Sequence, residues 1–135
     1  MNSMPEYTVQ LSGGDPDETA TISTEGKDGL CHVRLSYRGK FIEAAASDYF
    51  EAFSQVRMQL EPENLIPVCH GASLDVFPSG ICRDMSGGLS AYRLKLRKSP
   101  DRVDLVRIFE TGPDVKPATV ADQWNFFEKW LKKYT

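Results

Sequence analysis

The sequence has few of the residues and motifs that identify the commonest classes of enzyme. Only two histidines and three cysteines occur among its 135 residues, and no cysteine-protease signature surrounds them. The phosphate-binding lysine loop, the dinucleotide-binding glycine fingerprint and the Gly-x-Ser-x-Gly elbow of hydrolases are all missing. The sequence therefore gives no motif-based reason to expect nucleotide chemistry or serine hydrolysis.

Long hydrophobic runs and a basic excess are missing too. No segment approaches the roughly 20 apolar residues that span a bilayer, and the polar start, residues 1–6, does not resemble a signal peptide. The net charge is −3, whereas a nucleic-acid-binding protein usually needs a basic surface. The nearest basic cluster, residues 93–98, is more typical of the exposed face of a hairpin. We therefore expect no membrane partner and no nucleic-acid partner.

The size and composition suit one ordinary domain. A chain of 135 residues with 41% hydrophobic residues can bury enough surface to fold without a disulfide, a metal or another cofactor. Its three cysteines cannot all pair within one chain, which favours a reduced, cytoplasmic protein. We expect a single α+β domain over residues 1–135.

Alternating apolar and polar residues predict four strands in the first half of the chain, at 7–11, 19–23, 31–37 and 41–46. Turns rich in glycine and charged residues separate them, so neighbouring strands are expected to form hairpins. Ser47 is expected to cap a helix that runs to about Glu61 and buries Phe50, Phe53, Val56 and Leu60.

The second half predicts, at 65–68, either an edge strand interrupted by Pro67 or an extended approach to residues 69–88. Two further strands are predicted at 89–96 and 103–109, around a turn at 98–101. Because strands and helices are segregated along the chain, the predicted fold is α+β. We expect an antiparallel sheet of about five to six strands built from hairpins, with one central helix and one C-terminal helix packed on it.

The predicted C-terminal helix begins at Thr119, whose hydroxyl can cap it together with Asp122. Helical spacing groups several apolar residues into one stripe that is expected to pack on the sheet: Val120, Trp124, Phe127, Leu131 and Tyr134. Phe126 and Trp130 fall beside this stripe. They are candidates for contact with a partner protein.

Residues 69–88 have the most unusual composition in the chain. They hold four of the ten glycines, two of the three cysteines and one of the two histidines, without a helix or strand period. The simplest interpretation is a structural loop formed by Gly71, Pro78, Ser79, Gly80, Arg83, Asp84 and Gly88. In that loop Arg83 would donate to backbone carbonyls and Asp84 would accept from amides, while Phe77, Ile81 and Met85 would insert into the core.

The same stretch also offers two chemical interpretations. Cys69, His70 and Cys82 are metal-ligand types, but they lack the paired spacing of a zinc site, so we predict no metal. Alternatively, a small enzyme could use His70 as a base with Cys82 or Ser79 as the nucleophile. The sequence leaves this second interpretation open.

A family resemblance rests on the same region. The residues Gly71-Ala72, Asp75 to Gly80, Arg83 to Met85, Gly88 and Ala91-Tyr92 resemble a pattern in small, single-domain bacterial cytosolic proteins. Those proteins are associated with the immunity proteins of polymorphic-toxin and contact-dependent inhibition systems. The resemblance covers roughly residues 69–110. It implies a protein that blocks one cognate toxin, and it carries over no catalytic residue.

These observations lead to one functional hypothesis. A small acidic domain without catalytic motifs is expected to be a non-catalytic binding protein, in which case its partner is a cognate protein toxin domain such as a nuclease with a basic cleft. The candidate contact residues are the acidic and aromatic side chains Asp15, Asp17, Glu18, Asp48, Glu51, Phe126 and Trp130.

Overall fold

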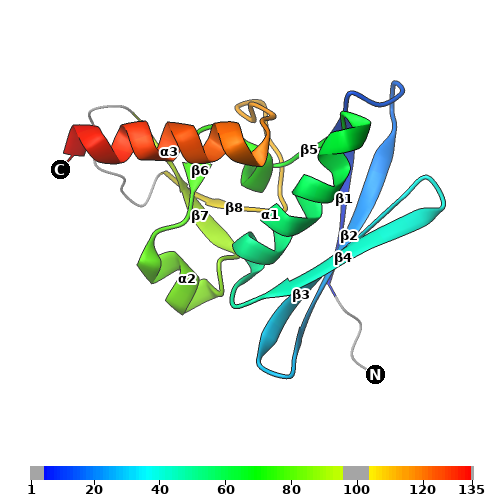
Figure 1. Cartoon of the computed structure of the whole chain (residues 1–135), viewed down its shortest axis with the longest axis horizontal. Helices are drawn as coiled ribbons and strands as arrows, with labels where there is room; N and C mark the ends of the chain where they lie inside the picture. The colour runs from blue at the N-terminus through cyan, green and yellow to red at the C-terminus, as the bar shows by residue number, and fades with distance from the viewer. Residues whose placement is uncertain (1–4, 96–103, 135) are drawn as a thin grey trace.

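The computed structural model describes residues 5–95 and 104–134. Within this part the chain is α+β, with a curled five-stranded antiparallel sheet, a separate three-stranded antiparallel sheet and three α-helices (Figure 1). The antiparallel α+β class is confirmed, but the expectation of one sheet is wrong. Strands that follow the fifth one pair among themselves, because that fifth strand is only three residues long and contains Pro67.

The larger sheet has the order β4-β3-β2-β1-β5. Its strands are β1 (Glu6–Ser12), β2 (Thr19–Lys27), β3 (Leu30–Tyr37), β4 (Lys40–Ala46) and β5 (Ile66–Val68). Two-residue turns at 28–29 and 38–39, with positive φ at both positions of each turn, join β2 to β3 and β3 to β4. β2 is longer than predicted, because residues 24–27 continue its pairing with β3.

The inner face of this sheet packs against helix α1 (Tyr49–Leu60). Phe50, Phe53, Val56 and Leu60 are all buried, as their spacing predicted. The helix cap differs from the prediction, since Asp48 rather than Ser47 caps α1, and its Oδ1 accepts a hydrogen bond from the Glu51 amide at 2.8 Å. A carboxylate at this position also interacts favourably with the positive end of the helix dipole.

The short 3₁₀ helix η1 (Glu61–Glu63) follows α1, and β5 leads into residues 69–88, which are more regular than expected. They contain the 3₁₀ helix η2 (His70–Ala72), strand β6 (Val76–Phe77) and helix α2 (Gly80–Ser86). Strands β7 (Ser90–Arg93) and β8 (Leu105–Arg107) complete the second sheet in the order β6-β7-β8. Both are shorter than predicted, and the predicted turn at 98–101 lies outside the described residues.

Helix α3 (Val120–Tyr134) begins where predicted, because the Thr119 Oγ1 accepts a hydrogen bond from the Asp122 amide at 3.1 Å. Its buried face only partly overlaps the predicted one, since Phe127 of the predicted stripe packs partly against the core. Trp124 is 48% exposed and Leu131 is 37% exposed, whereas Phe126 and Trp130 are packed partly against the core. No helix in the described ranges combines the length and apolarity needed to cross a membrane.

Candidate functional site

A buried polar cluster determines which face of α3 meets the rest of the molecule. Arg57 of α1 and Gln123 of α3 are only 2% and 1% exposed. Arg57 donates to the Gln123 Oε1 at 2.7 Å and to the carbonyls of Gly71 and Ala118 at 3.1 and 3.0 Å. The Gln123 Nε2 lies within 3.0 Å of three carbonyls, those of Gly71, Ser73 and Val76. These bonds fix α3 over η2 and β6.

Gly71 lies at the centre of this cluster for a steric reason. A Cβ atom at Gly71 would lie 2.9 Å from the Ile108 Cβ and 3.1 Å from the Phe53 ring. Only glycine allows this close approach of backbone to core. The structural role predicted for Gly71 is therefore consistent with the packing around it, whereas a Cβ at Gly80 would meet nothing within 4 Å.

Helix α2 is held against the start of α1 by an ion pair. The Arg83 Nη1 lies 2.6 Å from the Asp48 Oδ2, and the guanidinium also lies over the rings of Phe50 and Phe77. Arg83 was expected to donate to backbone carbonyls and Asp84 to accept from amides. Instead Arg83 binds a carboxylate, and Asp84 is exposed. A Cβ at Gly88 would lie 2.9 Å from the Asp48 Oδ1, so a larger residue there would displace this carboxylate.

An apolar hollow of about 410 Å³ lies between α2 and α3. Most of its lining is aromatic or aliphatic, and the Phe77 and Phe127 rings at its base are stacked with centroids 4.0 Å apart. The full lining comprises Phe77, Pro78, Ser79, Gly80, Arg83, Tyr92, Leu94, Phe127, Trp130 and Leu131. A smaller hollow of about 120 Å³ shares Phe77 and Arg83 with it and continues to Glu51, Met58 and Trp124.

Large apolar side chains are exposed around these two hollows. Ile81 and Met85 lie one turn apart on α2 and are 73% and 83% exposed. Trp124 on α3 and Met58 on α1 are each 48% exposed. Ile81 and Met85 were expected to insert into the core, but the ion pair between Arg83 and Asp48 turns the opposite side of α2 inward. We call the two hollows, together with Trp124 and the exposed side of α2 that carries Ile81 and Met85, the α2–α3 surface.

The predicted contact residues fall into separate places. Glu51 and Trp130 line the α2–α3 surface, and the Trp130 Nε1 donates to the Lys95 carbonyl at 3.2 Å. Phe126 lines a different groove. Asp48 is 5% exposed and occupied by its cap and by Arg83, which leaves it unsuited to contact a partner.

The turn between β1 and β2, which carries Asp15, Asp17 and Glu18, lies near the C-terminal end of α1 (Figure 1). Asp15 and Asp17 are exposed there. Glu18 is bound to Arg38 through two short contacts, at 2.5 and 2.9 Å, and Arg38 also pairs with Glu63 beyond the end of α1. The hydrogen bond from Arg38 lowers the pKa of Glu18 to about 2. Glu18 thus links the turn between β1 and β2 to the turn between β3 and β4.

In the alternative enzymatic interpretation, the proposed base His70 is hydrogen-bonded to neither of the proposed nucleophiles, Cys82 and Ser79. The His70 Nδ1 lies 3.1 Å from the Arg93 Nη2. The pKa of His70 is lowered, mainly by burial and to a smaller extent by the positive charge of Arg93. The Ser79 hydroxyl instead accepts from the Cys82 amide as the cap of α2, and Cys82 is 6% exposed. Within residues 5–95 and 104–134, no three His, Cys, Asp or Glu side chains gather as metal ligands.

A charged groove of about 630 Å³ lies beside His70 and Phe126. Its central carboxylate, Asp75, lies 3.5 Å from the Arg93 Nε and 3.4 Å from the Lys116 Nζ, and it also accepts from the Ser73 hydroxyl. Asp114 and Asp104 pair with Arg93 and Lys95 at 3.8 and 3.1 Å, so three carboxylates balance the three cations of the groove. This groove therefore presents no excess of either sign with which to attract a charged ligand.

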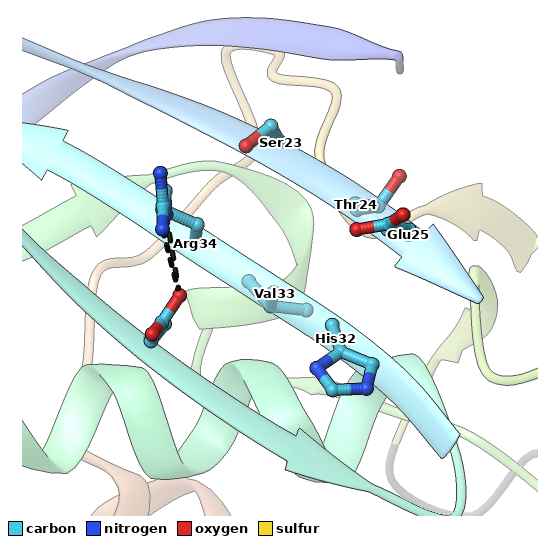
Figure 2. A pocket seen from close by; sticks show the side chains of 7 residues that line it. Ser23, Thr24, Glu25, His32, Val33 and Arg34 are labelled. Atoms are coloured by element: carbon cyan, nitrogen blue, oxygen red, sulfur yellow. Dashed lines mark hydrogen bonds and ion pairs between the residues drawn. The ribbon is translucent and has the colours of Figure 1, made fainter. Parts of the chain in front are cut away.

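A further hollow, of about 160 Å³, lies on the outer face of the larger sheet. Figure 2 shows Ser23 and Glu25 of β2 beside Arg34 and His32 of β3. The Arg34 Nη2 pairs with the Glu43 carboxylate at 3.1 Å, and the His32 Nε2 lies 3.3 Å from the Lys27 carbonyl. These are the exposed cross-strand pairs of a sheet that has one face in solvent.

Neither a protein-family model nor a curated protein sequence matches the chain. The site must therefore be judged on its own geometry, and the α2–α3 surface is the place where apolar side chains and a hollow coincide.

Proposed function

We propose that this chain is a non-catalytic binding protein that neutralises a cognate toxin domain, such as a nuclease, by direct contact in the cytoplasm. The observation that carries the proposal is the α2–α3 surface. Trp124, 48% exposed, lines its smaller hollow, and Ile81 and Met85 are 73% and 83% exposed on α2, the helix whose Gly80 and Arg83 line the larger hollow. Large apolar side chains left exposed on neighbouring elements of a small domain commonly mark protein–protein contact sites. The resemblance of residues 69–110 to immunity proteins supplies the class of partner.

The geometry of the surface suggests how a partner would be held. The hollow of about 410 Å³ is large enough to take an apolar anchor side chain of the partner, and aromatic rings form its base. Glu51 lies at the edge of the smaller hollow, so a basic group of the partner would meet a carboxylate there. The net charge of −3 favours encounter with a basic toxin surface.

Co-expression with the product of the neighbouring gene, which the proposal expects to carry the toxin domain, tests the proposal. The wild-type chain should protect cells and copurify with that domain. The double variant Ile81→Asp, Met85→Asp should lose affinity by about 100-fold or more, because it places two charges where an apolar contact forms. Its thermal stability should be unchanged, since both side chains point into solvent.

Leu30→Asp is the matched control, because Leu30 is also an exposed apolar residue, at 43%, but lies at the start of β3. It should bind like the wild type. Failure of the wild-type chain to protect cells or to form a complex would contradict the proposed function. Unchanged binding by the double variant would contradict the choice of surface.

A further inference from the structure

The two edges of the larger sheet are built differently. β5 is three residues long and contains Pro67, which has no amide hydrogen to donate. β4 is seven residues long, contains no proline and pairs only with β3. The edges of the smaller sheet, β6 and β8, have two and three residues. Among the described strands, β4 is therefore the long edge that no proline interrupts, and its one lysine, Lys40, lies at its first residue and pairs with Glu63.

The backbone groups that β4 presents to solvent follow from its hairpin. The two-residue turn at 38–39 makes Tyr37 and Lys40 a hydrogen-bonded pair, and such pairs alternate along antiparallel strands. Residues 42, 44 and 46 therefore bond to β3, while the amides and carbonyls of Phe41, Glu43 and Ala45 point away from the sheet. Within the described residues, none of these outward groups is hydrogen-bonded to another backbone group.

We propose that two copies of this chain associate by antiparallel pairing of their β4 edges across a twofold axis at Glu43. In this register Phe41 lies opposite Ala45 of the second copy, and each facing pair exchanges two backbone hydrogen bonds. Phe41 is 54% exposed in the single chain and would cover the small side chain opposite it.

The charges at the axis are compatible with this pairing. The two Glu43 side chains face each other, but each is already bound to its own Arg34 at 3.1 Å, so the group of four charges is neutral (Figure 2). A second copy in this register places a small residue opposite each large one on both sides of the axis. Because β5 is blocked by Pro67, association through β4 also closes at two copies and does not continue into a fibre.

Sedimentation of the wild-type chain from micromolar to near-millimolar concentration tests the proposal, with Ala45→Lys and Glu43→Pro as the disrupting variants. Lysine at the edge opposes strand addition, and proline at 43 removes an outward amide without removing a bond to β3. Both variants should raise the dimer dissociation constant by about tenfold or more while keeping the wild-type circular dichroism spectrum.

Two controls separate edge pairing from charge effects. Ser23→Lys adds the same charge to the outer face of an interior strand, and Glu43→Gln keeps the outward amide while removing the carboxylate. Both should dimerise within about threefold of the wild type. A wild-type chain that stays monomeric throughout, or a dimer that is weakened by Ile81→Asp but not by Ala45→Lys, would overturn the proposal. The test needs no toxin domain, so its outcome is independent of the proposed function.

Discussion

Two polar clusters use similar side chains in opposite environments. Arg57 is 2% exposed and is held by Gln123 and by two backbone carbonyls, whereas the Arg38 side chain is 40% exposed and is held by Glu18 and Glu63. In the buried cluster, a polar group that loses its hydrogen-bond partner has no water molecule to bond to in its place. In the exposed cluster, water can replace the partner. The comparison indicates that burial, more than the number of contacts, decides how much each cluster stabilises the fold.

Replacing Arg57 should give the largest effect. Arg57→Ala removes the donors for the Gln123 Oε1 and for the Ala118 carbonyl and leaves a cavity, so we expect a loss of about 3–5 kcal/mol in the free energy of unfolding. Chemical denaturation measures this loss. A loss below about 1 kcal/mol would mean that the buried cluster contributes no more than an exposed ion pair.

Replacing Gln123 should give a smaller loss, because Arg57 still binds the carbonyls of Gly71 and Ala118. For Gln123→Ala we expect about 1–3 kcal/mol of destabilisation. Asn125→Ala is the matched control, since Asn125 is an exposed amide two residues further along α3, and it should change stability by about 0.5 kcal/mol or less. Equal effects of the two variants in denaturation experiments would contradict the role assigned to Gln123.

The exposed cluster should be visible mainly through its pH dependence. The pKa of Glu18 is about 2 in the folded chain and 4.5 as the ordinary value, so its stabilising contribution is complete above pH 4.5 and is lost as the pH falls toward 2. Glu18→Gln should therefore show a shallower loss of stability over this range. Arg38→Gln should do the same, because it breaks the pair from the other side. Thermal melts at several pH values measure the effect, and wild-type curves for both variants would contradict it.

The regular strands and α1 could be predicted because their residues follow one simple period. The alternation in 31–37 and the spacing of Phe50, Phe53, Val56 and Leu60 each point to one buried face, and the structure has those faces. The division into two sheets could not be predicted in this way. Pairing partners of strands beyond β5 depend on long-range contacts that alternation alone does not encode.

The face of α3 shows why apolar spacing can mislead. Its sequence offers two overlapping apolar stripes, and the one with Trp124 and Leu131 has the more regular spacing. The position of Gln123, a polar residue, decided between them because Arg57 and three carbonyls required a partner in the interior. A glutamine between Asp122 and Trp124 carried no signal that it would be buried.

The candidate site was found only in part. Glu51 and Trp130 were named from the sequence and line the α2–α3 surface, but Ile81 and Met85 were assigned to the core. A capping signal for α2 was present, since Ser79 precedes the helix and Gly87 ends it with positive φ. That signal predicts a short helix without saying which side of it faces water. The orientation of α2 is set by the hydrogen bond from Arg83 to Asp48, which lies 35 residues earlier in the chain.

The sequence by itself determined the antiparallel strands, the two long helices and the start of α3, because these depend on local period and on capping residues close in the chain. The tertiary structure alone decided the split into two sheets, the buried face of α3 and the exposed side of α2. Those outcomes depend on Arg57 meeting Gln123 and on Arg83 meeting Asp48. Polar groups far apart in sequence must find each other when they are buried, and no local pattern specifies which ones will do so.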